Sequence, residues 1–231
     1  MGNKYKVVVL SLGGSLINGT GGFNIDFLIN FKKFILQHIK GGYRFVIVCG
    51  GGQVCREYQT AAKAVGVEKF SDLDWIGIYT THFNAGFMKI LFGKFAQDEI
   101  VKTEKNKIKW NNKILFSGGW VPGHSTDYDA VVLAKKYGAK TIVNLSNIDY
   151  VFDKDPNKFK DAQKIENISW KEFRKIVGNK WVPGANAPFD PIASREAEKN
   201  KFKVVVMNGN NLSDLAKVLK GEEKIVGTII A

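Results

Sequence analysis

Cysteine is scarce in this 231-residue chain, which contains only Cys49 and Cys55. Two cysteines six positions apart fit neither a disulfide framework nor a zinc knuckle, so reduced thiols are expected. Long hydrophobic runs are also missing, because no apolar stretch approaches the roughly 20 residues that cross a bilayer. Residues 1–6 lead directly into a strand-like run, so no signal peptide is expected there. These features predict a cytoplasmic protein with no membrane partner.

Arginine is the next rarity, since only four of the 34 basic residues are arginine although the formal net charge is +12. A charge of this size suits a nucleic-acid partner. Arginine, however, is the residue that most often reads base edges, and the lysines are spread along the whole chain. We therefore interpret the charge as a lysine-rich surface that attracts polyanionic small ligands, and we predict no nucleic-acid partner.

Complete metal-binding and phosphate-binding signatures are absent. The segment 153–164 begins like a calcium loop, but Lys158 stands where that loop needs glycine and Lys164 where it needs a carboxylate. Residues 14–20 have the outline of a P-loop without its lysine. The three histidines lack a metal-ligand spacing, and only His124 is a functional candidate.

Apolar, strand-like runs alternate with helical patterns along the chain. The runs are residues 5–12, 44–49, 113–116, 141–145 and 203–207. The main helical patterns are residues 25–39, which Asn24 caps, 75–92, 130–137, a helix started by Asp190-Pro191, and 211–219. Continuously apolar strands between helices predict an α/β fold, a three-layer αβα sandwich with a mostly parallel central sheet. We expect one domain, residues 1–231, with an edge strand at 226–230 and a hairpin at 99–112.

Three glycine clusters each follow a predicted strand, at residues 13–14, 50–52 and 118–119. Ligands of parallel sheets bind beyond the carboxyl ends of the strands, so these clusters are expected to converge on one edge.

The central loop, residues 117–127, joins a predicted strand to a predicted helix and holds three glycines, three hydroxyls and one carboxylate. Glycines let a backbone approach a ligand, and hydroxyls and free amides at a helix start suit a phosphate. Trp120 offers a flat apolar surface for a base or a neighbouring chain. An ordinary turn, with Thr126 or Asp127 as the N-cap, is the alternative. The loop alone leaves both interpretations open.

Six blocks together resemble the amino acid kinase superfamily, and within it the archaeal-like branch of the UMP kinases. They are SLGGSL (11–16), CGGGQVCREY (49–58), LDWIGI (73–78), GGWVPGHSTD (118–127), NLSNIDYVFDKDP (144–156) and FDPIA (189–193). The resemblance covers residues 5–230. It implies the amino acid kinase fold and Mg²⁺-dependent transfer of the γ-phosphoryl of ATP to UMP in pyrimidine nucleotide biosynthesis. It also implies a homo-oligomer, a hexamer built from dimers.

The resemblance also implies roles for individual residues. The UMP side would comprise Gly51, Asp74, Trp120, Val121, Pro122, Gly123, His124, Ser125 and Thr126. The ATP side, roughly residues 140–231 with the first glycine turns, would comprise Gly13, Gly14, Ser15, Gly52, Arg56, Ser146, Asn147, Phe152, Lys154 and Asp155. The catalytic set would be Asp127, Gly14, Ser15 and Arg56. Asp74 would accept the ribose hydroxyls of UMP, unless it is only a helix cap. Asp127 would either orient donors or help hold Mg²⁺, and both remain open; no protein ligand for Mg²⁺ is fixed beyond the ATP phosphates.

Several positions depart from the family pattern. Ser11 stands where most superfamily members have a lysine, which leaves Arg56, Lys154 and Mg²⁺ as candidates for charge stabilisation. His82 replaces an arginine, Trp120-Val121 replaces Thr-His, Phe152 replaces a common tyrosine, and the block 181–188 is unusual. A non-catalytic nucleotide- or oxyanion-binding protein, or a kinase of another small acid or phosphate ester, is the alternative. The acids Asp74 and Asp127 and the base Arg56 favour the enzyme.

Overall fold

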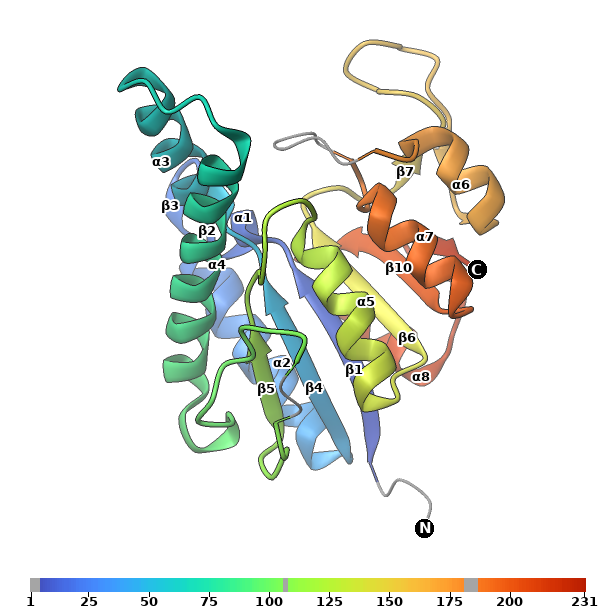
Figure 1. The fold of residues 1–231 in the computed structure, drawn as a ribbon. Helices are drawn as coiled ribbons and strands as arrows, with labels where there is room; N and C mark the ends of the chain where they lie inside the picture. Colours follow the sequence, from blue (N-terminus) through green and yellow to red (C-terminus); the bar gives the residue numbers. More distant parts are fainter. Residues whose placement is uncertain (1–4, 106–107, 181–186) are drawn as a thin grey trace.

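The computed structural model describes residues 5–105, 108–180 and 187–231, and it is built around a seven-stranded sheet (Figure 1). The strand order is β5-β4-β1-β6-β10-β11-β9. The strands are β1 (Lys6–Leu12), β4 (Tyr43–Cys49), β5 (Ile114–Ser117), β6 (Thr141–Ser146), β9 (Asn167–Ile168), β10 (Lys203–Asn208) and β11 (Thr228–Ile230). Every pairing is parallel except that of β10 with β11. The predicted mostly parallel sheet is confirmed.

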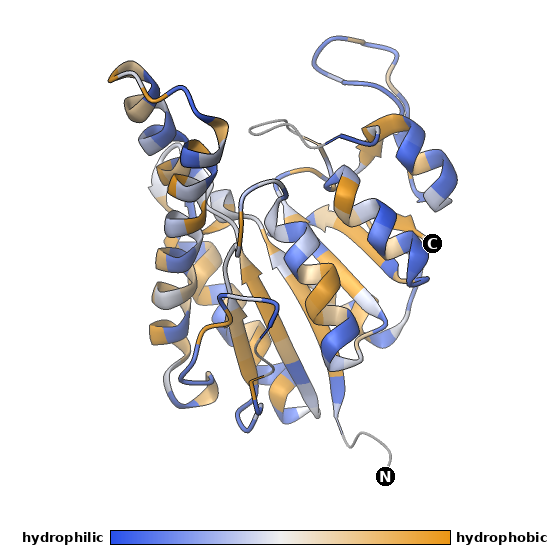
Figure 2. Ribbon diagram, in the orientation of Figure 1, coloured by the Kyte–Doolittle hydropathy of each residue, from blue (hydrophilic) through white to orange (hydrophobic). Residues whose placement is uncertain are grey.

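Helices cover both faces of this sheet, because successive side chains of a strand point to opposite faces. Leu10 and Leu12 of β1 pack into one core with helices α2 (Ile25–Lys40), α4 (Phe70–Phe92) and α8 (Leu212–Lys220). Val9 packs into the other core with α5 (Thr126–Tyr137), α6 (Trp170–Val177) and α7 (Pro191–Lys199). The strands are mostly hydrophobic, whereas the helices carry both hydrophilic and hydrophobic residues (Figure 2). This arrangement is the predicted three-layer αβα sandwich.

Short elements decorate the edge at which β1, β4, β5, β6 and β10 end (Figure 1). Helices α1 (Gly14–Ile17) and α3 (Gly52–Ala64) follow β1 and β4. The other short elements at this edge are the hairpin strands β2 (Asn18–Gly19) and β3 (Gly22–Phe23), and the hairpin strands β7 (Val151–Phe152) and β8 (Lys164–Ile165). The 3-10 turn η1 (Gly93–Phe95) lies at the opposite edge, where the Phe95 carbonyl accepts from the Lys113 amide just before β5. None of the helices in the described ranges is both long and apolar enough to span a bilayer.

Local capping chemistry fixes several of the predicted helix ends. The side chain of Asn24 accepts a hydrogen bond from the amide of Phe27, so α2 begins at the predicted cap. Gly138 ends α5 in the left-handed region, with φ of 72°. Asp190 caps α7 with Pro191 in its first turn. These predictions are confirmed.

Three sequence-based expectations are wrong. Helix α4 begins at Phe70 rather than near Trp75, because its N-cap residue Lys69 makes no side-chain hydrogen bond and gives no sequence signal. The described residues of segment 99–112 contain no hairpin, because buried Val101 forms a parallel bridge to Ser117 of β5 instead. Strand β11 is not an edge strand, because β9 pairs with its outer side.

Candidate active site

The first two glycine turns touch each other at the carboxyl end of the sheet. The amide of Gly13 donates to the Leu145 carbonyl, and the amide of Gly50 donates to the Leu12 carbonyl, both at 2.8 Å. A Cβ atom built on Gly14 would overlap the backbone of Gly50 and Gly52. Gly52 has a φ of 71°, a region that side chains rarely adopt. Glycine is therefore required for these turns to pack together, and the pair brings the starts of α1 and α3, whose first amides have no partner within the helix, next to each other.

A positive side chain lies beside these turns. The Arg56 guanidinium on α3 donates to Ser15 Oγ at 3.3 Å and to Gln53 Oε1 at 2.8 and 3.1 Å. Arg56 and Ser15, which were predicted to act together, are thus brought together from different elements. Gln53 was not singled out from the sequence; it holds the guanidinium over the start of α1. An exposed guanidinium beside free amides is suited to binding phosphate oxygens.

Asp127 of α5 receives hydrogen bonds from three different elements. Its Oδ1 accepts from Ser11 Oγ at 2.8 Å and from Asn144 Nδ2 at 2.9 Å, and its Oδ2 accepts from the Asp190 amide at 3.2 Å. Withdrawal from water raises the pKa of Asp127 to about 6, although the Ser11 hydrogen bond opposes that rise. The three donors to this carboxylate are therefore neutral. One of them is Ser11, at the position where most superfamily members have a lysine.

The N-cap of α5 is Ser125, not Thr126 or Asp127. Ser125 Oγ accepts a hydrogen bond from the Asp127 amide at 3.1 Å, while Thr126 is the first helical residue. The alternative that Asp127 is merely a cap is wrong, because its carboxylate faces Ser11, Asn144 and the backbone of Asp190. Asp190 in turn caps α7 through Oδ1 and accepts from the Ser125 amide through Oδ2 at 2.9 Å. Its second role was not predicted, because the partner lies 65 residues away.

The central loop is also fastened to α4. Oδ2 of Asp74 accepts a hydrogen bond from the Gly123 amide at 3.0 Å. Asp74 lies inside α4, so the alternative that it is an N-cap is wrong. At Gly119 the amide donates to Thr81 Oγ1 and the carbonyl lies 2.7 Å from Nε2 of His82. Burial lowers the pKa of His82, which keeps the imidazole neutral and able to donate to that carbonyl.

Two further polar side chains of α4 were missed by sequence reasoning. Thr81 is 6% exposed, and Asn84 is 4% exposed. Asn84 donates to the carbonyls of Gly50 and Gly51 at 2.7 and 3.2 Å, so α4 holds the second glycine turn as well as the central loop. The only signal in the sequence was the occurrence of polar residues in the middle of an otherwise apolar helix.

The side chain of Trp120 does not provide the flat surface expected of it. It is 6% exposed, packs in the core beneath α5, and donates from Nε1 to Ser117 Oγ at 3.2 Å. An indole buries a large apolar area when its N–H finds a partner, and Ser117 supplies that partner. The neighbouring Val121 is 52% exposed, and His124, Pro122 and Thr126 are half-buried. Only the backbone of Trp120 remains a candidate for ligand contact.

The remaining residues expected on the ATP side, those outside the glycine turns and α3, lie at the end of β6 and in the β7–β8 hairpin. Ser146 Oγ accepts from the Ile148 amide, Asn147 is exposed, and Phe152 is half-buried in β7. Lys154 donates to Asp161 at 2.6 Å, and Asp155 accepts from the Asn157 amide at 3.0 Å. The ammonium of Lys154 is thus paired within its own hairpin, whereas Arg56 lies directly beside Ser15. Of the unusual block 181–188, residues 181–186 lie outside the described residues.

The described residues do not form a dedicated site for Mg²⁺. No group of three or more histidine, cysteine, aspartate or glutamate side chains among them is placed to hold a metal ion. Both carboxylate oxygens of Asp127 already accept hydrogen bonds from the protein. Of the two roles left open by the sequence, this geometry fits the orientation of donors better than metal coordination.

The family follows from comparison with known proteins. A family model described as the amino acid kinase family matches residues 6–208. The chain belongs to the amino acid kinase family. Uridylate kinases of Thermoplasma volcanium and Methanoregula boonei are 32% and 33% identical to it over 225 and 229 residues, in each case 96% of both chains.

Solved structures of this family have the same fold. The crystal structure of uridylate kinase from Archaeoglobus fulgidus matches with a TM-score of 0.81 and 30% identity, over 97% of this chain and 99% of that one. The UMP kinase structure from Bacillus anthracis matches with a TM-score of 0.73 over 99% and 96% of the two chains. At 22% identity the second comparison shows the fold alone. The predicted amino acid kinase fold is confirmed.

Proposed function

We propose that this chain is a UMP kinase, a cytoplasmic enzyme that transfers the γ-phosphoryl group of ATP to UMP and forms UDP for pyrimidine nucleotide biosynthesis. The observation that carries this proposal is the network around Asp127. It ties the end of β1, just before the first glycine turn, to the central loop and to the start of α7. Relatives named uridylate kinase, which match nearly the whole chain, support the choice of substrate.

Phosphoryl transfer needs positioning and neutralisation of charge more than covalent participation by the protein. Backbone amides of Gly14 and Gly52 would receive the phosphate oxygens, and Arg56 with Ser15 would balance their charge. Gly13, whose own amide is held by the Leu145 carbonyl, would let the chain pass close to the phosphates. Mg²⁺ would enter with the ATP phosphates and neutralise part of their charge. Asp127 would orient the hydroxyl of Ser11 and the amide of Asn144 near the transfer centre.

The acceptor would lie between α4 and the central loop. Asp74 already holds the Gly123 amide with one oxygen, which leaves its other oxygen for a ribose hydroxyl of UMP. Gly51 and residues 120–126 would surround the nucleotide, with Ser125 and Thr126 near the uracil. Ser146, Asn147, Phe152, Lys154 and Asp155 would contact the adenosine side of ATP. In this proposal residues 1–231 form one domain, whose ATP side is roughly residues 140–231.

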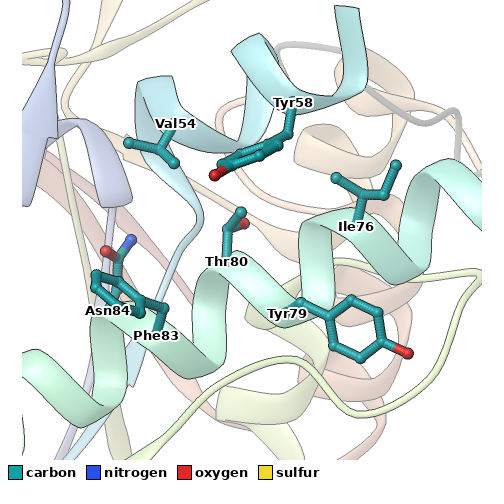
Figure 3. Close-up of a pocket in the computed structure, with 7 residues that line it drawn as sticks. All are labelled: Val54, Tyr58, Ile76, Tyr79, Thr80, Phe83 and Asn84. Atoms are coloured by element: carbon teal, nitrogen blue, oxygen red, sulfur yellow. The ribbon is translucent and has the colours of Figure 1, made fainter. Parts of the chain in front are cut away.

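The outer face of α3 and α4 supports a homo-oligomer. A cavity of about 370 Å³ lies there, and Tyr58, Tyr79 and Phe83 at its rim are 61, 63 and 71% exposed (Figure 3). Helix α4 carries no charged residue from Trp75 to Met88, although the whole chain carries a net charge of +12. Two copies of so basic a chain repel each other unless they meet on an uncharged apolar face. We therefore assign this face to contact between copies within the hexamer that the resemblance implies.

An acceptor panel tests the proposed function. ATP consumption would be measured in Mg²⁺ with UMP, CMP, dUMP, carbamate, acetylglutamate and isopentenyl phosphate. We expect turnover with UMP and clearly poorer rates with CMP and dUMP. Preference for another acid or phosphate ester would contradict the UMP assignment, and nucleotide binding without turnover on any acceptor would show a non-catalytic member of the family.

A further inference from the structure

Asp129 in the first turn of α5 is a buried carboxylate that the proposed reaction does not use. Its side chain is fully buried, and neither oxygen has a hydrogen-bond partner among the described residues. Buried polar groups are nearly always hydrogen-bonded, and buried charges are nearly always paired. An isolated carboxylate at this position therefore needs a physical explanation.

The groups that face Asp129 are mostly acidic. Asp127 shares its helix, Asp190 caps α7, and Glu104 lies in the segment before β5. Burial first, and then these three carboxylates, raise the pKa of Asp129 well above its ordinary value. Tyr128 is its neighbour on α5. A nearby base would offer this carboxyl group a polar neighbour in place of water.

His124 supplies such a base. Its Nδ1 lies 3.7 Å from Oδ1 of Asp129, and its side chain is 13% exposed. The imidazole packs on the Tyr128 ring, with centroids 4.4 Å apart, and its Nδ1 is 3.2 Å from the Ser125 carbonyl oxygen. The His124 side chain therefore lies between the backbone of the central loop and the first turn of α5.

The loop on either side of His124 is held by other carboxylates. Asp74 binds the Gly123 amide, and Asp190 binds the Ser125 amide. We propose that Asp129 is a positioning residue whose buried carboxyl group, 3.7 Å from Nδ1 of His124, attracts the imidazole and thereby fixes the middle of the central loop against α5. The proposal rests on the proposed function in one respect, namely that this loop receives UMP.

The variant Asp129→Asn separates this role from a purely structural one. It keeps the shape of the side chain but removes the carboxyl group that faces His124. We expect KM for UMP to rise about tenfold, while kcat changes less than about twofold and KM for ATP is unchanged. Thermal stability should stay the same or increase, because the variant removes a buried carboxylate that has no hydrogen bond.

Asp214→Asn is a matched control. Asp214 is also a buried acid in the first turn of a helix, but it is fully partnered, by the Val226 amide and by Lys217, each at 2.6 Å. This control should lower the melting temperature and leave KM for UMP unchanged. If Asp129→Asn behaves like the control, with reduced stability and an unchanged KM, the proposed positioning role is wrong.

Nuclear magnetic resonance tests the pairing without any substrate. The chain contains only three histidines, so the ring signals of His124 can be assigned with His38→Gln and His82→Gln variants. We expect the ring signals of His124 to move in the Asp129→Asn variant, because the ring lies 3.7 Å from the substituted group, while those of His38 stay in place. Unchanged His124 signals would overturn the pairing. Because this measurement needs no UMP, it remains decisive even if the acceptor is another molecule.

A double variant measures the coupling. His124→Phe removes the base and keeps a ring beside Tyr128. If the two residues act as one unit, His124→Phe/Asp129→Asn raises KM for UMP no more than the more severe single variant does. If the fold-increases in KM for UMP of the two single variants multiply in the double variant, the residues act independently. This result would overturn the proposal.

Discussion

The polar side chains of the central loop and those of the β7–β8 segment differ in how far away in the sequence their partners lie. In the central loop the partners are distant in sequence, with separations of 116 residues for Ser11 and Asp127 and 63 for Asp190 and Asp127. In the β7–β8 segment the partners are local, with separations of seven residues for Lys154 and Asp161 and ten for Gln163 and Asp153. The overall fold therefore sets the shape of the central loop. The side chains between β7 and β8 pair within their own segment, although the backbone of Val151 and Ile165 is fastened to Thr228 of β11.

This difference has a consequence for substrate binding. Side chains whose partners come from several packed elements are pre-organised, and pre-organisation lowers the cost of ordering on binding. Side chains paired locally at an exposed hairpin can change partners without disturbing the sheet. We expect the acceptor side to be formed before UMP binds, and the ATP side to exchange its local pairs for contacts with the nucleotide.

The largest effect should come from Asp127→Asn. Asparagine can accept with one oxygen but cannot supply the negative charge that orients Ser11 and Asn144. Loss of a pre-organised electrostatic group typically costs roughly 10²–10³-fold in kcat, and we expect a loss of this size with both substrates still bound. Steady-state kinetics and calorimetry would check both parts. A near-normal kcat would remove Asp127 from the chemistry and leave charge stabilisation to Arg56, Lys154 or the metal.

The stability of the Asp127→Asn variant relative to the unsubstituted protein should depend on pH. The folded protein raises the pKa of Asp127 to about 6 from an ordinary value near 3.8, so it binds this proton more tightly than the unfolded chain does. Stability from Asp127 is therefore fully present below about pH 3.8 and is lost as the pH rises through about 6. The Asp127→Asn variant has no such loss, because its amide does not titrate. Melting temperatures should shift in favour of the variant between about pH 4 and about pH 7, and a constant difference would contradict the assigned pKa.

Asp74→Asn should have the second-largest effect, confined to the acceptor. The asparagine oxygen can still accept from the Gly123 amide, so the loop keeps its place. A charge-assisted bond to a ribose hydroxyl contributes about 1.5–3 kcal/mol, and its loss lowers UMP affinity roughly 10- to 100-fold. ATP affinity should hardly change. Calorimetry that shows equal losses of affinity for UMP and ATP would contradict the assignment of Asp74 to the acceptor side alone.

Ser11→Ala should have a smaller effect, because Asn144 still donates to the same oxygen of Asp127. Removing one donor to a buried carboxylate raises its pKa, so the acid limb of kcat should move above its wild-type position near pH 6. We expect kcat at about pH 7 to fall roughly fivefold, less than the full value of a hydrogen bond to a charged group. Ser194→Ala is the control, because its hydroxyl is also buried but donates to the backbone carbonyl of Asp190, the N-cap of α7, and not to Asp127. An unmoved acid limb would show that Ser11 does not tune Asp127.

The local parts of this structure could be predicted from the sequence. The cap at Asn24, the end of α5 at Gly138 and the start of α7 at Asp190 each depend on side chains within four residues. The mostly parallel character of the sheet follows from continuously apolar strands that alternate with helices. The long-range parts could not be predicted. Ser125, Thr126 and Asp127 are equally good caps by composition, and only the distant partners of Asp127 and Ser125 decide among them.

The orientation of individual side chains could not be predicted from the sequence either. Trp120 turns inward because Ser117 and the Val101 backbone lie beneath it, and nothing within the loop sequence indicates that the segment before β5 passes there. Asn84 reaches the carbonyls of Gly50 and Gly51 across 34 and 33 residues. Such contacts exist only once the helices are packed on the sheet, so they appear in the sequence merely as polar residues in an apolar helix.

The smallest effect should come from Lys154→Met in the β7–β8 segment. Lys154 pairs with Asp161, whose side chain is 76% exposed, and solvent-exposed pairs contribute about 0–1 kcal/mol to stability. The melting temperature should therefore barely change. If Lys154 leaves Asp161 to meet ATP, KM for ATP should rise about threefold and KM for UMP should stay constant. Asp161→Asn is the matched variant, because it frees the ammonium of Lys154, and it should lower KM for ATP or leave it unchanged. A rise in KM for ATP in both variants would mean that the ion pair itself shapes the nucleotide site, so that the β7–β8 segment is pre-organised like the central loop.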